Sequence, residues 1–262
     1  MRTCRSLLAG FVLVPCAILT QAQEPYPQVL SQGPLTLLIA YKCKPRDRVK
    51  LRERMVNSEI VNFKKWQSEG LVKDYHVLFS RYLDTDNYDM FLLLMFDTYS
   101  NVSRWKEIEK TSPGGLSQVT LTLVVSATTY PLDLIRSASL PQRRSSQKEA
   151  IFFVIPYDYS VPTDQYVRYL DGYVLPQMTG WMQEKVLSRY NIYLSRYAAS
   201  RPWSSLFVLE YINDEAFGER ESTMRKIRNE LQGNPDWKAF SENKQSVRLE
   251  KEAVIADELT AR

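Results

Sequence analysis

This 262-residue sequence has only three cysteines and one histidine, His76. Three cysteines are too few for a disulfide-stabilised scaffold, and one histidine argues against a histidine-rich metal centre. Nine glycines and thirteen prolines exclude collagen-like and low-complexity proteins. The GxGxxG, Walker A, HExxH and CxxC motifs are also absent. We therefore expect neither a metal nor a cofactor.

The sequence has one long apolar run, at residues 7–19, and this run follows Arg2 and Arg5. Thr20-Gln21-Ala22 then supplies small residues for cleavage after Ala22. This arrangement predicts a signal peptide over residues 1–22 and a secreted or periplasmic protein. A lipoprotein with Cys16 lipidated is the alternative, although Pro15 stands where a small residue normally precedes that cysteine. Once the signal peptide is removed, we expect no membrane segment.

Loss of the signal peptide also changes the charge and the cysteine content. Without Arg2 and Arg5 the net charge falls from +4 to +2. A nucleic-acid-binding protein needs a basic stripe interleaved with aromatic residues, so we expect no nucleic-acid partner. Cys43 is then the one remaining cysteine, and its place at the end of an apolar strand predicts a buried thiol.

An internal repeat with an offset of 115 residues divides the chain. Ser-Arg-Tyr occurs at 80–82 and 195–197, Trp66 matches Trp181, and the apolar run 91–94 matches 206–209. One offset held across three segments predicts two homologous halves. Residues 136–149 are polar and rich in serine and arginine, which is typical of an exposed connector. The predicted divisions are unit 1 at 34–134, a linker at 135–148 and unit 2 at 149–260.

Each half shows the same order of hydrophobic patterns. The first half has predicted strands at 35–41, 71–82, 90–96 and 121–130, and helices at 47–69 and 102–110. The second half has predicted strands at 151–157, 186–197, 205–211 and 252–259, and helices at 164–185, 215–231 and 236–249. The order β-α-β-β-α-β predicts an α+β fold of two tandem ferredoxin-like units. Because each unit leaves one sheet face bare, the two bare faces can cover each other.

This element order, together with the stretches FVLEY at 207–211 and NPDWK at 234–238, resembles the dimeric α/β-barrel superfamily. The resemblance is to a tandem-duplicated, secreted bacterial member. It implies an intramolecular, pseudo-dimeric α/β barrel that closes without a second chain. The protein could then be a monomer or a higher homo-oligomer. The superfamily includes monooxygenases, chlorite dismutases, haem-degrading enzymes and proteins with no known reaction, so the fold alone fixes no function. Haem ligands in the family are usually helical histidines, and His76 lies in a predicted strand.

Four of the five candidate ligand-binding residues lie on one face of the long second strands, and the fifth, Glu210, lies on the predicted strand 205–211. Side chains alternate along a strand, and the more polar face of these two strands is predicted to line the barrel lumen. The candidates are His76, Arg189, Asn191, Tyr193 and Glu210. His76 is a potential acid or base that Asp74 could orient, or else a strand histidine with an ordinary hydrogen bond. Glu210 interrupts an apolar strand and needs a partner such as Arg189 or a ligand.

Two classes of function fit these features. The first is a protein that binds a small apolar or aromatic molecule in the barrel lumen. The alternative is a non-catalytic interaction module with a packed barrel core, or a cofactor-independent monooxygenase-like enzyme. Whether the protein is an enzyme stays open at the level of sequence. A cavity inside the lumen would favour the first class over a packed module.

Overall fold

The computed structural model describes residues 35–141, 150–199 and 201–261. The predicted signal peptide, residues 1–22, and residues 142–148 of the predicted linker lie outside the described residues. Among the helices that are described, none is both long enough and apolar enough to cross a membrane.

The first half contains four strands and the helices that connect them. The strands are β1 (Leu35–Cys43), β2 (Asp74–Ser80), β3 (Met90–Phe96) and β4 (Val124–Ser139). The helices are α1 (Arg48–Arg54), α2 (Ile60–Ser68), α3 (Tyr99–Thr111) and α4 (Gln118–Leu121), with a π-helical turn at Met55–Glu59 joining α1 to α2. Gly70 follows α2 with a φ of 68°, a left-handed conformation that favours glycine after a helix. Thr98 caps α3 by accepting a hydrogen bond from the backbone N–H of Asn101.

The second half begins with the same sequence of elements. Its strands are β5 (Ile151–Tyr159), β6 (Leu187–Ser195), β7 (Ser205–Tyr211), β8 (Arg248–Glu250) and β9 (Val254–Glu258). Its helices are α5 (Thr163–Tyr169), α6 (Leu175–Gln183), α7 (Asp214–Gly218), α8 (Arg220–Leu231), α9 (Pro235–Glu242) and α10 (Lys244–Val247). A π-helical turn at Leu170–Val174 joins α5 to α6, 115 residues after the π-helical turn of the first half.

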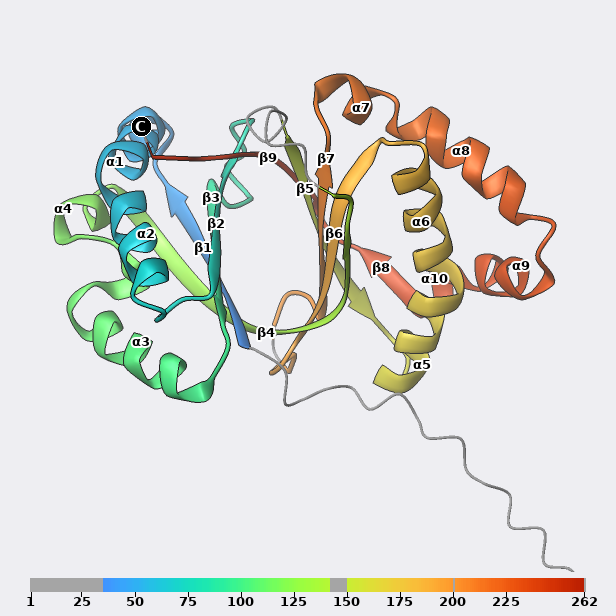
Figure 1. Cartoon of the computed structure of the whole chain (residues 1–262), viewed down its shortest axis with the longest axis horizontal. Helices are drawn as coiled ribbons and strands as arrows, with labels where there is room; N and C mark the ends of the chain where they lie inside the picture. Colours follow the sequence, from blue (N-terminus) through green and yellow to red (C-terminus); the bar gives the residue numbers. More distant parts are fainter. Residues whose placement is uncertain (1–34, 142–149, 200, 262) are drawn as a thin grey trace, which may run out of the picture.

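The strands close into an eight-stranded antiparallel barrel in an α+β fold. Their order is β7-β6-β4-β1-β3-β2-β9-β5, and β5 pairs again with β7 to close the ring, while β8 pairs with β5 beside β9. The helices of the first half pack on one side of this barrel and those of the second half on the other (Figure 1). All described strands therefore have a partner in the ring, and the barrel has an enclosed lumen.

Strand β4 is longer than the sequence pattern predicts. It continues through residues 135–139, the first part of the predicted linker, because these residues pair with β6, where Ser139 lies opposite Arg189. Only polar and half-buried side chains lie along this part of the strand, so it carries no clear hydrophobic alternation. The length of β4 is therefore fixed by its pairing with β6, which the local sequence does not encode.

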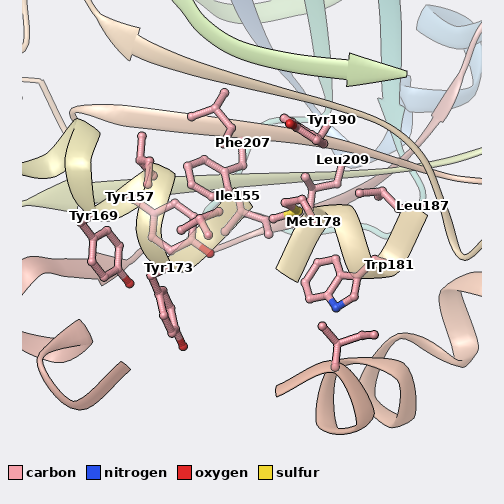
Figure 2. Packing of buried hydrophobic residues seen from close by; sticks show 14 of the residues in the cluster. Ile155, Tyr157, Tyr169, Tyr173, Met178, Trp181, Leu187, Tyr190, Phe207 and Leu209 are labelled. Atoms are coloured by element: carbon pink, nitrogen blue, oxygen red, sulfur yellow. The ribbon is translucent and has the colours of Figure 1, made fainter. Parts of the chain in front are cut away.

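The barrel separates three hydrophobic clusters. One cluster lies between the sheet and the helices of the second half and contains Tyr190, Ile192 and Trp181 (Figure 2). A second contains Val77 and Phe79 under the helices of the first half. The third fills the middle of the lumen and includes Leu78, Phe152, Tyr193 and Val208. The alternation along β2 and β6 thus predicted correctly which face lies under the helices and which faces the lumen.

The arginines of the two Ser-Arg-Tyr segments bridge the two seams of the barrel. Arg81, beside β2, pairs with Asp257 on β9 at 2.7 Å. Arg196, at the end of β6, pairs with Asp133 on β4. Each arginine thus binds a carboxylate of the other half, at the two places where the halves exchange strand pairing.

Packing between α6 and α8 requires a glycine at position 180. A β-carbon added to Gly180 would lie 2.7 Å from Cγ2 of Ile227. Gly218 in α7 has no neighbouring atom within 4 Å of such a β-carbon and serves as the matched control. We expect Gly180→Ala to lower the free energy of unfolding by about 1–3 kcal/mol, and Gly218→Ala to leave it unchanged or raise it by up to about 1 kcal/mol. Urea unfolding measures both values, and equal effects would contradict this packing.

Candidate functional site

His76 lies on β2 with its side chain in the lumen, close to two carboxylates. Its Nδ1 is 2.6 Å from Glu258 Oε1 on β9, and its Nε2 is 4.0 Å from Asp74 Oδ2. Burial lowers the pKa of His76, but the hydrogen bond and charge of Glu258, with the charge of Asp74, more than offset burial and the nearby Arg189. The net result is a pKa raised above 6.5, which favours the protonated ring.

Arg189 on β6 lies opposite Glu210 on β7, and the two form an ion pair with Nε to Oε2 at 3.3 Å. The hydroxyl of Ser188 donates to the other carboxylate oxygen of Glu210 at 2.8 Å. Glu210 is buried, so these two partners compensate the cost of placing a carboxylate in an apolar strand. The predicted partnership between Glu210 and Arg189 is therefore present.

Tyr193 and Asn191 follow Arg189 on the lumen face of β6. Tyr193 is fully buried, and its hydroxyl has no hydrogen-bond partner among the described residues. Burial raises the pKa of Tyr193 well above 10, and the charge of Arg189 acts in the opposite direction. The charge of Arg189 opposes the raised pKa of both His76 and Tyr193, as expected of three residues in one region of the lumen. Asn191 lies between Arg189 and Tyr193 on the same face.

A cavity of about 410 Å³ lies at the opposite end of the lumen from His76. The strands β1, β2, β5 and β6 all run in the same direction along the barrel. The cavity opens near the ends of β1 and β5, at Lys42 and Pro156. His76 and Arg189 lie near the starts of β2 and β6, and therefore at the other end. The apolar part of its wall includes Leu38, Phe91, Val154, Leu206 and Val254. Its volume and apolar wall are typical of a small-molecule site.

Three aromatic residues share the cavity wall with polar and charged residues, among them Lys42, Asp86, Lys251 and Glu252. The hydroxyls of Tyr88 and Tyr130 lie 2.9 Å apart, and the Trp203 ring packs on Tyr130 with 4.7 Å between ring centroids. Two hydroxyls that share one hydrogen bond keep one proton free for a further acceptor. Burial raises the pKa of Tyr130 well above 10, so its hydroxyl stays neutral at physiological pH. Within this wall the three aromatic residues thus offer a flat surface and one hydroxyl donor.

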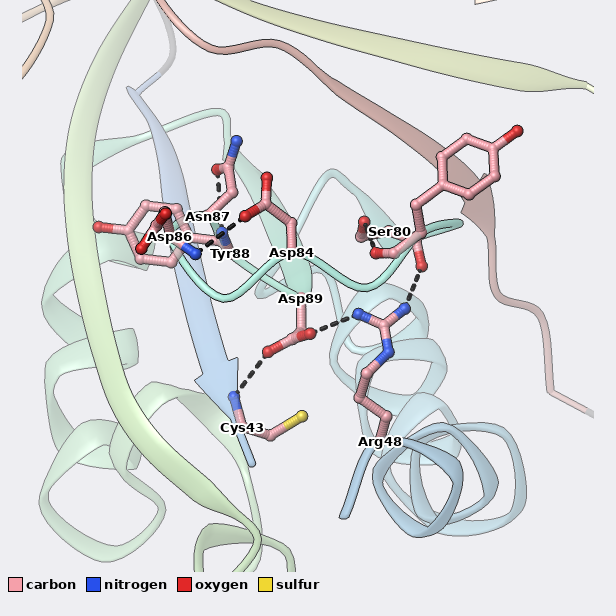
Figure 3. A network of polar contacts seen from close by, with 9 residues as sticks. Cys43, Arg48, Ser80, Asp84, Asp86, Asn87, Tyr88 and Asp89 are labelled. Atoms are coloured by element: carbon pink, nitrogen blue, oxygen red, sulfur yellow. Dashed lines mark hydrogen bonds and ion pairs between the residues drawn. The ribbon is translucent and has the colours of Figure 1, made fainter. Parts of the chain in front are cut away.

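The loop that carries Tyr88 is anchored to the rest of the first half by Asp89 (Figure 3). The Asp89 carboxylate accepts hydrogen bonds from the backbone N–H of Cys43, at 2.8 Å, and from Arg48. Arg48 also donates to the carbonyl of Ser80 at 2.6 Å. These contacts join the loop to the ends of β1 and β2 and so fix the cavity wall. Cys43 is buried, as predicted.

The sequence pattern did not identify Tyr88 or Trp203, because both lie in loops without periodicity. The repeat could have found them, since they are 115 residues apart and occupy matching positions in the two halves. Alternation carried to the ends of the predicted strands, 71–82 and 186–197, also predicts that Tyr82 and Tyr197 face the lumen, but they are exposed by 62% and 66%. That prediction was wrong because β2 ends at Ser80 and β6 at Ser195, so the alternation does not reach these tyrosines.

The residues present do not fit a histidine-ligated haem of the kind some superfamily members use. His76 is the single histidine of the sequence, and its Nε2, the nitrogen that Glu258 leaves free, lies 4.0 Å from the carboxylate of Asp74 instead of facing an open space. Its ring centroid also lies 6.0 Å from that of Phe152. No haem chemistry follows from these contacts.

Comparison with known proteins relates the chain to others through its structure. No protein-family model matches the sequence, and the search of curated proteins found no match. Among solved structures, a protein described as a "putative monooxygenase" from Fusobacterium nucleatum matches with a TM-score of 0.55 and 10% identity, over 87% of this chain and 93% of that one. A second, from Lactobacillus acidophilus, matches with a TM-score of 0.54 and 12% identity, over 87% and 94%.

An anthrone oxidase-like protein also matches, with a TM-score of 0.53 and 11% identity, over 89% of this chain and 93% of that one. At such identities the likeness concerns the fold and carries no activity with it. Because each match spans nearly the whole of both chains, it includes both halves of the barrel. The chain therefore shares the α/β-barrel fold of these solved structures.

Proposed function

We propose that this protein binds a small, largely apolar molecule with an aromatic ring in the cavity beside Trp203. The observation that supports it is the combination, in one 410 Å³ cavity, of an apolar wall with the Trp203–Tyr130 aromatic pair. Aromatic faces favour flat rings, and the free proton of the Tyr88–Tyr130 pair suits a neutral oxygen or nitrogen acceptor. The packed cluster in the middle of the lumen confines the ligand to this end.

We also propose that the barrel consists of two tandem copies of one ferredoxin-like unit, near residues 34–134 and 149–260. The strand orders β4-β1-β3-β2 and β9-β5-β7-β6 support this arrangement, because they match position by position. Matching π-helical turns and matching cavity residues, Tyr88 and Trp203, support it further. Linked copies close the barrel intramolecularly, at an effective concentration of order millimolar. Secretion stays a prediction from the sequence.

The neutral fluorophore N-phenyl-1-naphthylamine tests the binding site. We expect it to bind one-to-one with enhanced fluorescence, and Val254→Phe to weaken binding about tenfold by filling the cavity, a loss of about 1.4 kcal/mol. His76→Asn at the other end of the lumen is the control and should leave the affinity within about twofold.

The same titration separates the competing interpretations. If the ligand instead contacts the sequence-predicted residues at the His76 end, His76→Asn weakens binding and Val254→Phe does not. If the barrel is a packed interaction module, no saturable binding occurs in any variant. Circular dichroism of each variant confirms that a loss of binding is not a loss of fold.

A further inference from the structure

Arg248, at the start of β8, is surrounded by aromatic rings in the core of the second half. Its guanidinium carbon lies 3.9 Å from the ring centroid of Tyr157, 4.9 Å from that of Phe207 and 5.5 Å from that of Tyr169. These rings come from β5, β7 and α5, so the charge sits between the sheet and the helices. This place is outside the barrel lumen and separate from the cavity proposed above.

The positive charge of Arg248 has no acidic partner among the described residues. No carboxylate lies within 4.0 Å of it there, and its Nη1 is buried without a hydrogen-bond partner. Glu250, two residues along β8, is exposed and accepts instead from the hydroxyl of Tyr157 at 2.9 Å. A buried guanidinium without a counter-charge is costly. Contacts with ring faces offset part of this cost but use none of the five N–H donors.

Tyrosine hydroxyls beside Arg248 also lack partners. Tyr166 and Tyr169 lie one turn apart on one face of α5. Their buried hydroxyls make no hydrogen bond of normal geometry among the described residues, although both lie close enough to the Arg248 guanidinium to interact with it. Burial raises the pKa of both tyrosines and outweighs the opposing charge of Arg248, so both hydroxyls stay protonated. The matching positions of the first half, 115 residues earlier, are Leu51 and Arg54, so packing of this helix on the sheet does not itself require tyrosine.

We propose that Arg248, with Tyr166 and Tyr169, forms a binding site for a small oxyanion, such as a phosphate or the carboxylate of a metabolite. The groups gathered there supply a positive charge and hydroxyl donors, and the complement of such a set is a negatively charged acceptor. Stacking covers the faces of the guanidinium and leaves its N–H edge for the anion. Arg248 is half-buried as a whole while its Nη1 is buried, so an anion bound there is largely shielded from solvent.

Inorganic phosphate is the probe for this site, with chloride at equal ionic strength as the reference. We expect phosphate at millimolar concentration to raise the Tm of the full chain saturably, and isothermal titration to show one site per chain. Arg248→Met should abolish both effects. Arg136→Gln, which removes an arginine already paired with Asp171 at 2.7 Å, should keep the phosphate response.

Two results would overturn the proposal. One is a phosphate response that is the same in the wild type and in Arg248→Met. The other is no response in the wild type together with a large loss of stability in Arg248→Met without phosphate, which would assign Arg248 a purely structural role on the aromatic rings. Tyr166→Phe, which keeps the ring, should weaken phosphate binding about 2- to 10-fold without unfolding the chain.

Discussion

Replacing Asp89 by alanine is expected to lower the free energy of unfolding by about 3–5 kcal/mol. The Asp89 carboxylate is buried and is the acceptor for both the backbone N–H of Cys43 and the guanidinium of Arg48. The Arg48 side chain is itself only 13% exposed. Removing the carboxylate therefore leaves a buried amide and a largely buried positive charge without their partner, which costs more than the loss of one hydrogen bond. Equilibrium unfolding in urea measures this loss.

Asp86, in the same loop, is the matched control for Asp89. Its side chain is exposed, and its backbone N–H rather than its carboxylate makes the contact with Asp84. Asp86→Ala should change the free energy of unfolding by less than about 0.5 kcal/mol. Asp89→Asn keeps an acceptor for Cys43 but loses the charge facing Arg48, so it should fall between the two. Loss values for Asp89→Ala and Asp86→Ala within 1 kcal/mol of each other would show that Asp89 does not anchor the loop.

Two apolar strands could be predicted from the sequence with correct bounds, because a continuous run of apolar residues marks where each begins and ends. The strands at 90–96 and 205–211 are found where they were predicted, since they are buried on both faces and read as continuous apolar runs. β4 could not be bounded in this way. Its last residues are held by pairing with β6, which depends on the closed barrel and leaves no local pattern.

The His76 end of the lumen could be predicted from local sequence patterns, whereas the cavity end could not. Alternation along β2 and β6 placed His76 and Arg189 in the lumen, and the buried Glu210 implied a charged partner. The cavity end was not predictable from alternation, because its aromatic residues Tyr88 and Trp203 lie in loops between strands. Which end of a lumen is hollow depends on side-chain volumes summed over many strands, and no short sequence window contains that information.

The stability of the fold is expected to decrease as the pH rises above 6.5, because of His76. Burial and the charge of Arg189 lower the pKa of His76. Glu258 and Asp74 raise it by more, so it lies above the value of about 6.5 that it has in the unfolded chain. A raised folded-state pKa means that the folded state binds the proton more tightly. The stabilisation is therefore complete below pH 6.5 and is lost as the pH rises through the folded-state pKa, with a slope of at most about 1.4 kcal/mol per pH unit.

Urea unfolding at pH 6, 7, 8 and 9 tests this expectation, with His76→Asn as the comparison, since asparagine is the residue at the matching position 191. His76→Asn should remove most of the decline between pH 6.5 and 9. Cys43 does not interfere, because burial raises the pKa of its thiol to about 12. Glu258→Gln removes the hydrogen-bonded carboxylate while keeping the histidine, so it should also flatten the profile. Parallel profiles for the wild type and both variants would show that the His76–Glu258 contact is not linked to folding.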